Sequence, residues 1–370
     1  MEISNIKMIS FRNHENTNMS FGSGITIIWG KNGSGKTSIL EAIHSLSFGS
    51  SFRTNNKKEL IKEGSNNFSL EGFFKNKKGA ENTIFFSQDT RGNKKIKINK
   101  KEIKRRKDLL GLNNVVVFSP EEETITKSGP NHRRNFFNKV FSIVSKNYLE
   151  NLLSYNSVLE QRNALLKINS KKKINKQIEI WNNPFSEKAE SLWKKRKELL
   201  VEFLEVFKET AKNLDLGIMC DISYEPKKTN KEEVTKTLEK ALDTEITLGF
   251  TTHGPHRDDF LFEWGGRTIR KHGSQGEHKM FLALLKTTEL LFISKKTKKN
   301  PVFLIDDIFA NLDIERSKRL LRFVEELRLQ EELMPQTIIT TTDILEVQKE
   351  DFFLNYNKIK KKKLWFSEAS

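Results

Sequence analysis

A glycine-rich run that ends in lysine and threonine is the stretch best suited to chemistry: Gly30-Lys31-Asn32-Gly33-Ser34-Gly35-Lys36-Thr37. It fits the pattern G-x-x-x-x-G-K-[ST], in which glycines let successive backbone N–H groups turn toward a phosphate. The apolar run Ile25–Trp29 precedes it, and the helix-like segment Ser38–Ile43 follows, adding free amides and a positive dipole end. We predict a nucleotide phosphate site, with Lys36 at the β- and γ-phosphates and the Thr37 hydroxyl on Mg²⁺. The alternative is a glycine-rich turn that binds no ligand.

Two acids end a second apolar run. Pro301–Ile305 is predicted to be a buried strand, and Asp306 and Asp307 follow it. Because ligands of open α/β sheets lie at the carboxyl ends of strands, Asp306 is predicted to hold Mg²⁺ opposite Thr37. Asp307 is expected to point to the other face of the strand and to polarise an attacking water. The alternative is a strand cap made by two solvated acids.

A third segment, Gly273-Ser274-Gln275-Gly276, precedes the helical run 280–285. A serine and a glycine at the start of a helix provide a hydroxyl and amides that can donate to a phosphate. One site does not need two such surfaces on one chain, but two copies can sandwich one nucleotide between them. This pattern predicts an ATP-dependent homodimer; the alternative is an ordinary capped helix.

The elements that position these segments are predicted from periodicity. Residues 1–29 fit a hairpin followed by the strand that enters the phosphate loop, and 38–47 a helix. Residues 68–103 fit an antiparallel meander, and 115–118 a short buried strand. The segments 136–167 and 186–213 are helical in period, with a break at Ser170–Lys173.

An α/β pattern returns after Gly249, with a helix predicted over 314–332 and a strand over 336–341. The resulting domain prediction is an ATPase lobe made of residues 1–130 and 245–370, interrupted by a helical arm or second lobe over 131–244.

The charge balance favours a polyanionic partner. The 370 residues include 65 Lys+Arg and 48 Asp+Glu, which gives a formal net charge of +17. Nucleic acid is the first candidate, and a lysine-rich solvated surface fits the charge equally well. A single cysteine, Cys220, excludes an internal disulfide framework and a cysteine zinc site. No leader pattern and no run near the roughly 18 apolar residues that cross a bilayer is found. We expect a soluble, cytoplasmic protein with no membrane partner.

Three smaller groups of residues are open to more than one interpretation. His253 and His256 lack the spacing of a metal site and are interpreted as structural. A basic cluster is expected to face DNA, the nucleotide or solvent, and its members are Arg257, Arg267, Arg270, Lys271 and His272. The run Lys360–Lys363 is expected to be a solvated tail, and the alternative is non-specific contact with phosphates.

These motifs, in this order, resemble the RecF recombination-mediator family of SMC-like ATPases of the ABC type. The resemblance covers residues 3 to about 345. Its specific parts are Gly254-Pro255-His256-Arg257-Asp258-Asp259 and Gly273–Gly276, whereas the phosphate loop is widespread. Other matching segments are Phe11-Arg12-Asn13, Glu59-Leu60-Ile61, Ser119-Pro120-Glu121, Leu304–Asp307 and Thr340–Asp343. The implied fold is an ABC-type ATPase head, a mixed sheet around the phosphate-loop helix plus an antiparallel meander, with a short helical second lobe.

The resemblance also implies residue roles. Lys36, Asp307 and Ser274 would be catalytic, as the Walker A lysine, the residue in place of the catalytic acid and the signature serine acting in trans. Thr37 and Asp306 would hold Mg²⁺. The residues implied at ATP are Arg12, Asn13, Gly30, Lys31, Asn32, Gly33, Ser34, Gly35, Lys36, Thr37, Ser38, Ser274, Gln275 and Gly276.

Some positions depart from the family pattern or lie outside the motifs just named. Asn311–Asp313 would touch the partner subunit, and Thr342-Asp343 would occupy the switch position that transporters usually fill with histidine. Glu277–Lys279 replaces a glutamine-rich continuation, and Glu121 stands where many relatives have glutamine. Aspartate at position 307 is a shorter base than glutamate and suggests slow hydrolysis.

The function that the resemblance implies is ATP-dependent DNA binding in recombinational repair and replication. An ATP-driven dimer would clamp double-stranded DNA near single-strand junctions or gaps, and weak, DNA-stimulated ATP hydrolysis would reset it. RecR and RecO would be partners in loading RecA onto single-stranded DNA. The alternative is an ABC-type ATPase subunit of another system, with a transport or SMC-like structural role; a nucleotide kinase is a third possibility.

Overall fold

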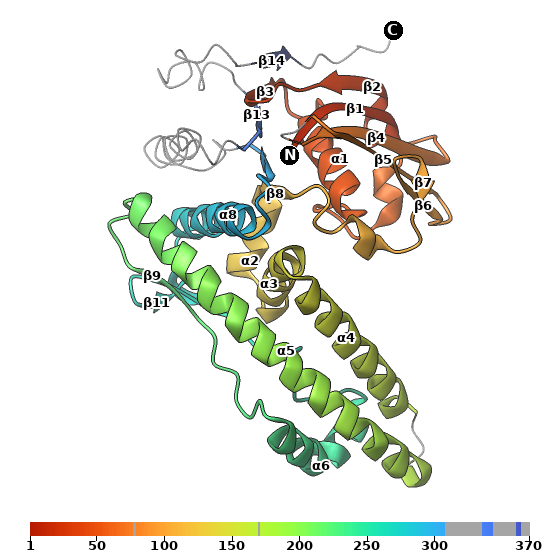
Figure 1. Cartoon of the computed structure of the whole chain (residues 1–370), viewed down its shortest axis with the longest axis vertical. Helices are drawn as coiled ribbons and strands as arrows, with labels where there is room; N and C mark the ends of the chain where they lie inside the picture. Colours follow the sequence, from red (N-terminus) through yellow and green to blue (C-terminus); the bar gives the residue numbers. More distant parts are fainter. Residues whose placement is uncertain (77–78, 169–170, 308–334, 343–359, 364–370) are drawn as a thin grey trace. The chain divides into compact units, whose positions relative to one another are not determined.

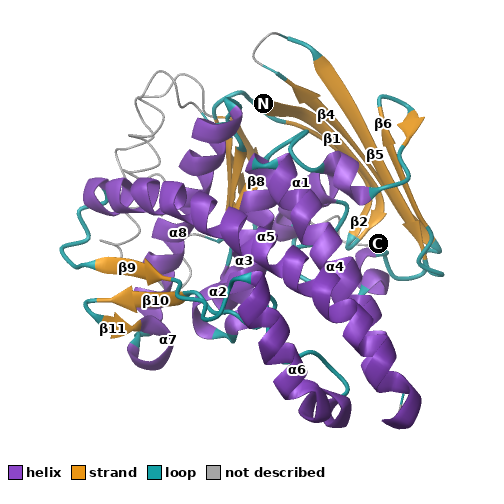
Figure 2. Ribbon diagram, turned by 60° about the horizontal axis from the view of Figure 1, so that its bottom comes forward, coloured by secondary structure: helices purple, strands orange, loops and turns teal. Residues whose placement is uncertain are grey.

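The computed structural model describes residues 1–76, 79–168, 171–307, 335–342 and 360–363. The chain divides into a first unit, Met1–Glu123 with Lys279–Ser370, and a second unit, Thr124–His278. Helices and strands occur in both units, so the predicted α/β class is confirmed (Figures 1 and 2). No helix in the described ranges is long and apolar enough to cross a membrane.

A parallel sheet in the first unit carries the phosphate loop. Its strand order is β14-β3-β13-β12-β8. The bounds are β3 Ile25–Trp29, β8 Val115–Phe118, β12 Val302–Ile305, β13 Thr337–Thr341 and β14 Lys360–Lys363. β8 and β12 are buried along their whole length, and this explains their unbroken apolar sequences.

The strand β14 corrects the prediction of a solvated tail. The backbone of Lys360–Lys363 pairs in parallel with Thr26–Trp29 of β3. The physical reason is that a strand at the edge of a sheet has unpaired N–H and C=O groups, which another extended segment can satisfy.

An antiparallel sheet forms the rest of the first unit's β structure. Its order is β2-β1-β4-β5-β6-β7. The bounds are β1 Glu2–Phe11, β2 His14–Ser20, β4 Asn67–Lys75, β5 Glu81–Asp89, β6 Lys94–Ile98 and β7 Lys101–Glu102. Because β4 to β7 follow one another in both sequence and space, the predicted meander is confirmed, as is the hairpin of β1 and β2.

The helix α1, Lys36–Phe48, packs against strands of both sheets. Every residue of α1 except Thr37 is buried. Glycines in left-handed conformation flank the helix, Gly35 at its start and Gly49 at its end. Short 3₁₀ turns complete the described N-terminal part of this unit: η1 Lys57–Leu60, η2 Arg106–Leu109 and η3 Pro120–Glu123.

The second unit is mainly helical. Its helices are α2 Thr124–Lys127, α3 Pro130–Val144, α4 Lys146–Leu166, α5 Lys171–Asn213, α6 Lys231–Leu248 and α7 Ile269–His272. A small sheet in the order β11-β10-β9 joins them, with β9 Cys220–Ser223, β10 Leu261–Trp264 and β11 Arg267–Thr268. Figure 1 shows α4 and α5 side by side. The helix α8, Gln275–Thr297, begins in this unit and ends in the first.

The helices predicted over 38–47, 136–167 and 186–213 exist but with different limits, whereas the helix predicted over 314–332 lies outside the described residues. The segment 136–167 is two helices, because Ser145 has an extended backbone and its side chain accepts a hydrogen bond from Tyr148 N as the cap of α4. α5 begins at Lys171 rather than 186 and continues through Pro184. Its apolar face extends further back than the periodicity suggested, since Ile178 is fully buried in a cluster with Leu166 and Ile246.

The second unit extends beyond the predicted limits of 131 and 244 to Thr124 and His278. The reason is a network of ion pairs and hydrogen bonds that ties the segment after Gly254 to the helices. The carboxylate of Asp258 accepts hydrogen bonds from Trp193 Nε1 (2.7 Å), Arg196 Nη1 (3.0 Å) and the Tyr224 hydroxyl (2.5 Å). Asp259 forms a two-point ion pair with Arg133 of α3, at 2.8 and 2.9 Å.

A buried ion pair gives a test of what holds the helices of the second unit together. Arg162 Nη2 of α4 lies 2.7 Å from Glu245 Oε2 of α6, and both side chains have zero exposure. We expect Arg162→Ala to lower the free energy of unfolding by about 3–5 kcal/mol, because Glu245 is left charged and buried. Lys188→Ala, which breaks an exposed pair with Glu187, should leave the free energy of unfolding nearly unchanged. Denaturant unfolding measures both, and equal costs would contradict this account.

Candidate functional site

The phosphate loop joins the end of β3 to the start of α1. Gly33 and Gly35 have left-handed backbones, with φ of 80° and 89°. A Cβ on Gly35 would lie 2.5 Å from His14 Nε2 and 2.8 Å from Asn13 Oδ1, so a side chain there would meet β2 and the turn before it. The buried hydroxyl of Ser34 has no hydrogen-bond partner among the described residues. The loop thus carries both the required turn and an unused donor.

The Lys36 side chain folds back over the loop. Its Nζ donates to the carbonyl of Gly30 at 2.7 Å and to that of Lys31 at 3.0 Å. Burial lowers the pKa of Lys36, while the nearby charges of Asp307 and Asp306 act to raise it. An anion beside this ammonium would therefore stabilise its charged form.

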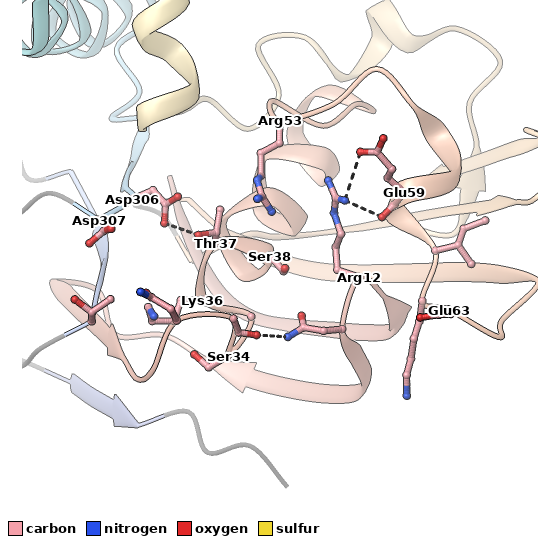
Figure 3. Close-up of a pocket in the computed structure, with 17 residues that line it drawn as sticks. Arg12, Ser34, Lys36, Thr37, Ser38, Arg53, Glu59, Glu63, Asp306 and Asp307 are labelled. Atoms are coloured by element: carbon pink, nitrogen blue, oxygen red, sulfur yellow. Dashed lines mark hydrogen bonds and ion pairs between the residues drawn. The ribbon is translucent and has the colours of Figure 1, made fainter. Parts of the chain in front are cut away.

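Asp306 and Thr37 meet directly (Figure 3). Thr37 Oγ1 donates to Asp306 Oδ1 at 2.9 Å. Thr340 of β13 donates to the same oxygen at 2.5 Å. Asp306 is only 5% exposed, and burial raises the pKa of its carboxyl group.

Asp307 does not take the orientation expected from strand alternation. β12 ends at Ile305, and Asp307 has a left-handed backbone with φ of 46°. Its N–H donates to Thr340 Oγ1 at 3.1 Å. The alternation of faces stops with the strand, so Asp307 lines the same cavity as Asp306.

These residues line a cavity of about 630 Å³ in the first unit (Figure 3). A cavity of this size lies within the range that holds small ligands. Of the residues implied at ATP, the lining includes Arg12, Asn13, Asn32, Gly33, Ser34, Gly35, Lys36, Thr37 and Ser38. Gly30 and Lys31 contribute the carbonyl groups that hold Lys36 and do not line the cavity.

Arg12 and Asn13 are fixed at the wall of the cavity. Asn13 Nδ2 donates to the Gly33 carbonyl at 3.0 Å. Arg12 has a left-handed backbone, φ 55°, and makes two hydrogen bonds to the carboxylate of Glu41. Both side chains are therefore held by protein groups at the cavity.

The donor set fits a nucleotide with magnesium. Mg²⁺ binds oxygen ligands, commonly one or two protein oxygens together with substrate phosphates. Asp306 and Thr37 provide two adjacent oxygens, and no group of three or more His, Cys, Asp or Glu side chains suited to a metal occurs in the described ranges. The unused Ser34 hydroxyl and the Lys36 ammonium suit the phosphates.

The Ser274 segment lies in the second unit and does not line this cavity. Glu277 N donates to Ser274 Oγ at 3.3 Å, and Ser274 N donates to Glu277 Oε2 at 2.7 Å. This reciprocal pair is a capping box at the start of α8. Ser274 and Gln275 are exposed, and Gly276 is half-buried.

Sequence reasoning missed several residues of the site. Thr340 bridges the two acids, and Arg53 lines the cavity and donates from Nε to Glu121 Oε1 at 3.1 Å. Glu41 is completely buried in α1. Glu41 has a sequence signal, because it is the one acid in an otherwise uncharged stretch of α1 after Lys36. Arg53 has none, since it comes from an irregular loop.

The remaining predictions have mixed outcomes. His256 is held by the Tyr155 hydroxyl (2.5 Å) and by the Thr251 carbonyl (3.0 Å), and burial lowers its pKa to about 4, which agrees with a structural role. The basic cluster, from Arg257 to His272, is exposed in the second unit. Thr342 lines the cavity, whereas Asn311–Asp313 and Asp343 lie outside the described residues.

Comparison with known sequences identifies relatives over nearly the whole chain. The profile of the "RecF/RecN/SMC N terminal domain" matches residues 2–363. The chain is 35% identical over 355 residues to the DNA replication and repair protein RecF of Ruminiclostridium cellulolyticum, covering 93% of each chain. It is 32% identical over 370 residues to the RecF protein of Leptospira interrogans, covering 97% of this chain and 99% of that one.

Solved structures give the same result. The fold matches that of the recombination mediator protein RecF-ATP in the RecFOR pathway with a TM-score of 0.83 at 31% identity, covering 92% of each chain. An Smc head bound to the C-winged helix domain of ScpA matches at a TM-score of 0.55 and 19% identity, over 97% of this chain and 93% of that one, which is a likeness of fold. By sequence and by structure, therefore, this chain belongs to the RecF family of the RecF/RecN/SMC proteins.

Proposed function

We propose that this chain is an ATP-dependent DNA-binding protein of recombinational repair and replication. The observation that carries the proposal is the meeting of Thr37 and Asp306 at 2.9 Å beside a phosphate loop, in a cavity of about 630 Å³. The relatives named for DNA replication and repair, and the solved RecF-ATP structure, support the same function.

ATP with Mg²⁺ is the proposed ligand of this cavity. Asp306 and Thr37 would hold the metal ion, which neutralises phosphate charge when it is bound. The loop amides, the Ser34 hydroxyl and the Lys36 ammonium would bind the phosphates. Asp307, with its carboxylate at the cavity, would accept a proton from an attacking water. Its short side chain suits weak hydrolysis that acts as a timed switch.

The second half of the site would come from another copy of the chain. Ser274 is exposed at the start of α8 and outside the cavity, so its hydroxyl is available to a nucleotide held by a partner. The dimer would clamp double-stranded DNA near single-strand junctions or gaps. Together with RecR and RecO it would help to load RecA onto single-stranded DNA, and ATP hydrolysis, stimulated by DNA, would open it.

Light scattering with and without ATP–Mg²⁺, followed by addition of gapped DNA, tests the proposal as a whole. We expect a dimer only with ATP, and DNA affinity that falls steeply as salt is raised, because basic side chains release counterions from the phosphates. DNA affinity indifferent to both ATP and salt would reject the clamp.

Lys36→Ala should abolish ATP binding and dimer formation together. The change removes the Lys36 ammonium that folds over the loop, so the phosphates lose this cationic partner. Titration with a fluorescent ATP derivative measures the affinity, and Lys7→Ala, at an exposed lysine on β1, is the matched control. Equal affinity of the two variants would show that the phosphates bind elsewhere.

Asp306→Asn should raise the thermal midpoint of the nucleotide-free protein at pH 7–8. Burial raises the carboxyl pKa, so the ionised form is disfavoured in the folded state and an amide removes that cost. The gain should vanish below the ordinary aspartate pKa of about 4, where the wild-type side chain is protonated both folded and unfolded. The same variant should lose the stabilisation by ATP–Mg²⁺. A thermal midpoint of Asp306→Asn that is lower than that of the wild type at pH 8 would contradict this cause.

Asp307→Asn and Ser274→Arg should separate ATP binding from pairing. Asparagine tolerates the left-handed backbone of Asp307, so that variant should bind ATP and accumulate as a dimer that does not reopen. Ser274→Arg should bind ATP in each monomer and fail to pair, because the arginine obstructs the contact in trans. Light scattering with ATP measures both, and a monomeric Asp307→Asn would refute the assigned role.

A further inference from the structure

Glu41 is a buried acid in the helix that follows the phosphate loop. Its side chain has zero exposure, and Leu40 and Ala42 beside it are equally buried. A carboxylate in such a place is costly unless charged partners and hydrogen bonds compensate for the lost water. The partners of Glu41 are therefore informative, and two of them, Arg12 and Arg53, line the cavity.

The first partner is Arg12. Its Nε donates to Glu41 Oε2 at 2.8 Å and its Nη2 to Oε1 at 2.7 Å, a two-point contact that fixes the plane of the guanidinium group. Its Nη1 donates to the Glu59 carbonyl at 2.8 Å, and its backbone N–H donates to Leu60 O at 2.9 Å. The Arg12 side chain is 17% exposed, so it is held in one place and still faces the cavity.

The second partner is the loop that carries Arg53. The Ser51 hydroxyl donates a short hydrogen bond to Glu41 Oε1. The same hydroxyl accepts hydrogen bonds from the backbone N–H groups of Arg53 (2.8 Å) and Thr54 (3.1 Å). Arg53 Nη1 also lies 3.7 Å from Glu41 Oε2. One carboxylate thus holds Arg12 directly and holds the Arg53 loop through a serine.

We propose that Glu41 is a positioning residue for the nucleotide: it fixes the guanidinium groups of Arg12 and Arg53 at the wall where the phosphates bind. The inference rests on the proposed binding of ATP in this cavity. Glu41 itself does not line the cavity, and its effect reaches the ligand through the two arginines.

Charge and position predict opposite effects when Glu41 is neutralised. Removing a negative charge near a polyanion should by itself tighten the binding of ATP. Losing the two-point contact should weaken it, because two long cationic side chains must then be ordered by the ligand at an entropic cost. The sign of the change in affinity therefore distinguishes a positioning role from a background charge.

The experiment compares Glu41→Gln with the wild type by titration of a fluorescent ATP derivative in the presence of Mg²⁺. We expect the affinity to fall by roughly tenfold or more, as for other small misplacements of binding groups. Arg12→Lys, which keeps the charge but cannot form the two-point contact, should give a similar loss. Ser51→Ala, which releases only the Arg53 loop, should give a smaller one.

A double substitution separates positioning from general damage to the fold. In an Arg12→Ala background, Glu41→Gln should weaken ATP binding much less than it does alone. The thermal midpoint of each nucleotide-free variant is recorded alongside. If Glu41→Gln does not fold, Arg12→Lys and Ser51→Ala carry the test on their own.

Unchanged or tighter ATP binding by Glu41→Gln, or an equal loss with and without Arg12, would overturn the inference. If Glu41→Gln does not fold, unchanged ATP affinity of both Arg12→Lys and Ser51→Ala would also overturn the inference. Failure of the proposed function can be told apart from failure of this inference. If ATP does not bind in this cavity, Lys36→Ala would also retain ATP binding.

Discussion

The site depends on one hydrogen bond between distant parts of the chain. Thr37 and Asp306 are 269 positions apart and meet at 2.9 Å. They meet because β13 pairs in parallel with both β3 and β12, so the carboxyl ends of the three strands lie at one edge of the sheet. Thr340 at the end of β13 completes the contact with a hydrogen bond to Asp306. The site therefore exists only once the C-terminal strands have joined the N-terminal ones.

Burial sets the charge properties of this edge before any ligand arrives. It lowers the pKa of Lys36 and raises that of Asp306, so the charged form of each group is less favoured than in water. A ligand that brings both an anion and a cation would relieve both effects, and nucleotide with magnesium is such a ligand. The left-handed backbone of Asp307 adds local strain at the same place. Two groups with shifted pKa values and one residue with a left-handed backbone thus lie together at this edge of the sheet.

The sequence predicted the parts of the site that depend on local pattern. The phosphate loop, the strand before Asp306, the meander and the α/β class follow from residue types and short-range periodicity, and the structure agrees. Contacts set by tertiary packing were not predictable. Asp307 faces the cavity because β12 ends one residue before Asp306, and α5 begins before Pro184, where Ile178 belongs to a buried cluster. Periodicity carries no information on where a strand stops pairing or which face a neighbouring helix covers.

The departures from the family pattern around α8 have local structural partners. Glu277 forms the capping box with Ser274, and His278 lies 3.0 Å from the Thr126 hydroxyl, both within the second unit. Lys279 pairs with Glu123 at 3.8 Å within the first unit. Each of these side chains therefore contributes to holding the start of α8.

The acids of the turn η3 also form ion pairs, with side chains of α8 and of the cavity wall. Glu123 pairs with Lys279, Glu122 with the buried Lys286 at 2.8 Å, and Glu121 with Arg53 at the cavity wall. Three successive carboxylates thus tie one turn to α8 and to a cation of the nucleotide cavity. A glutamine at position 121 would keep a hydrogen bond to Arg53 but lose the ion pair. Glutamate at this position is therefore suited to holding the Arg53 guanidinium when no phosphate competes for it, and this gives the departure a physical reason.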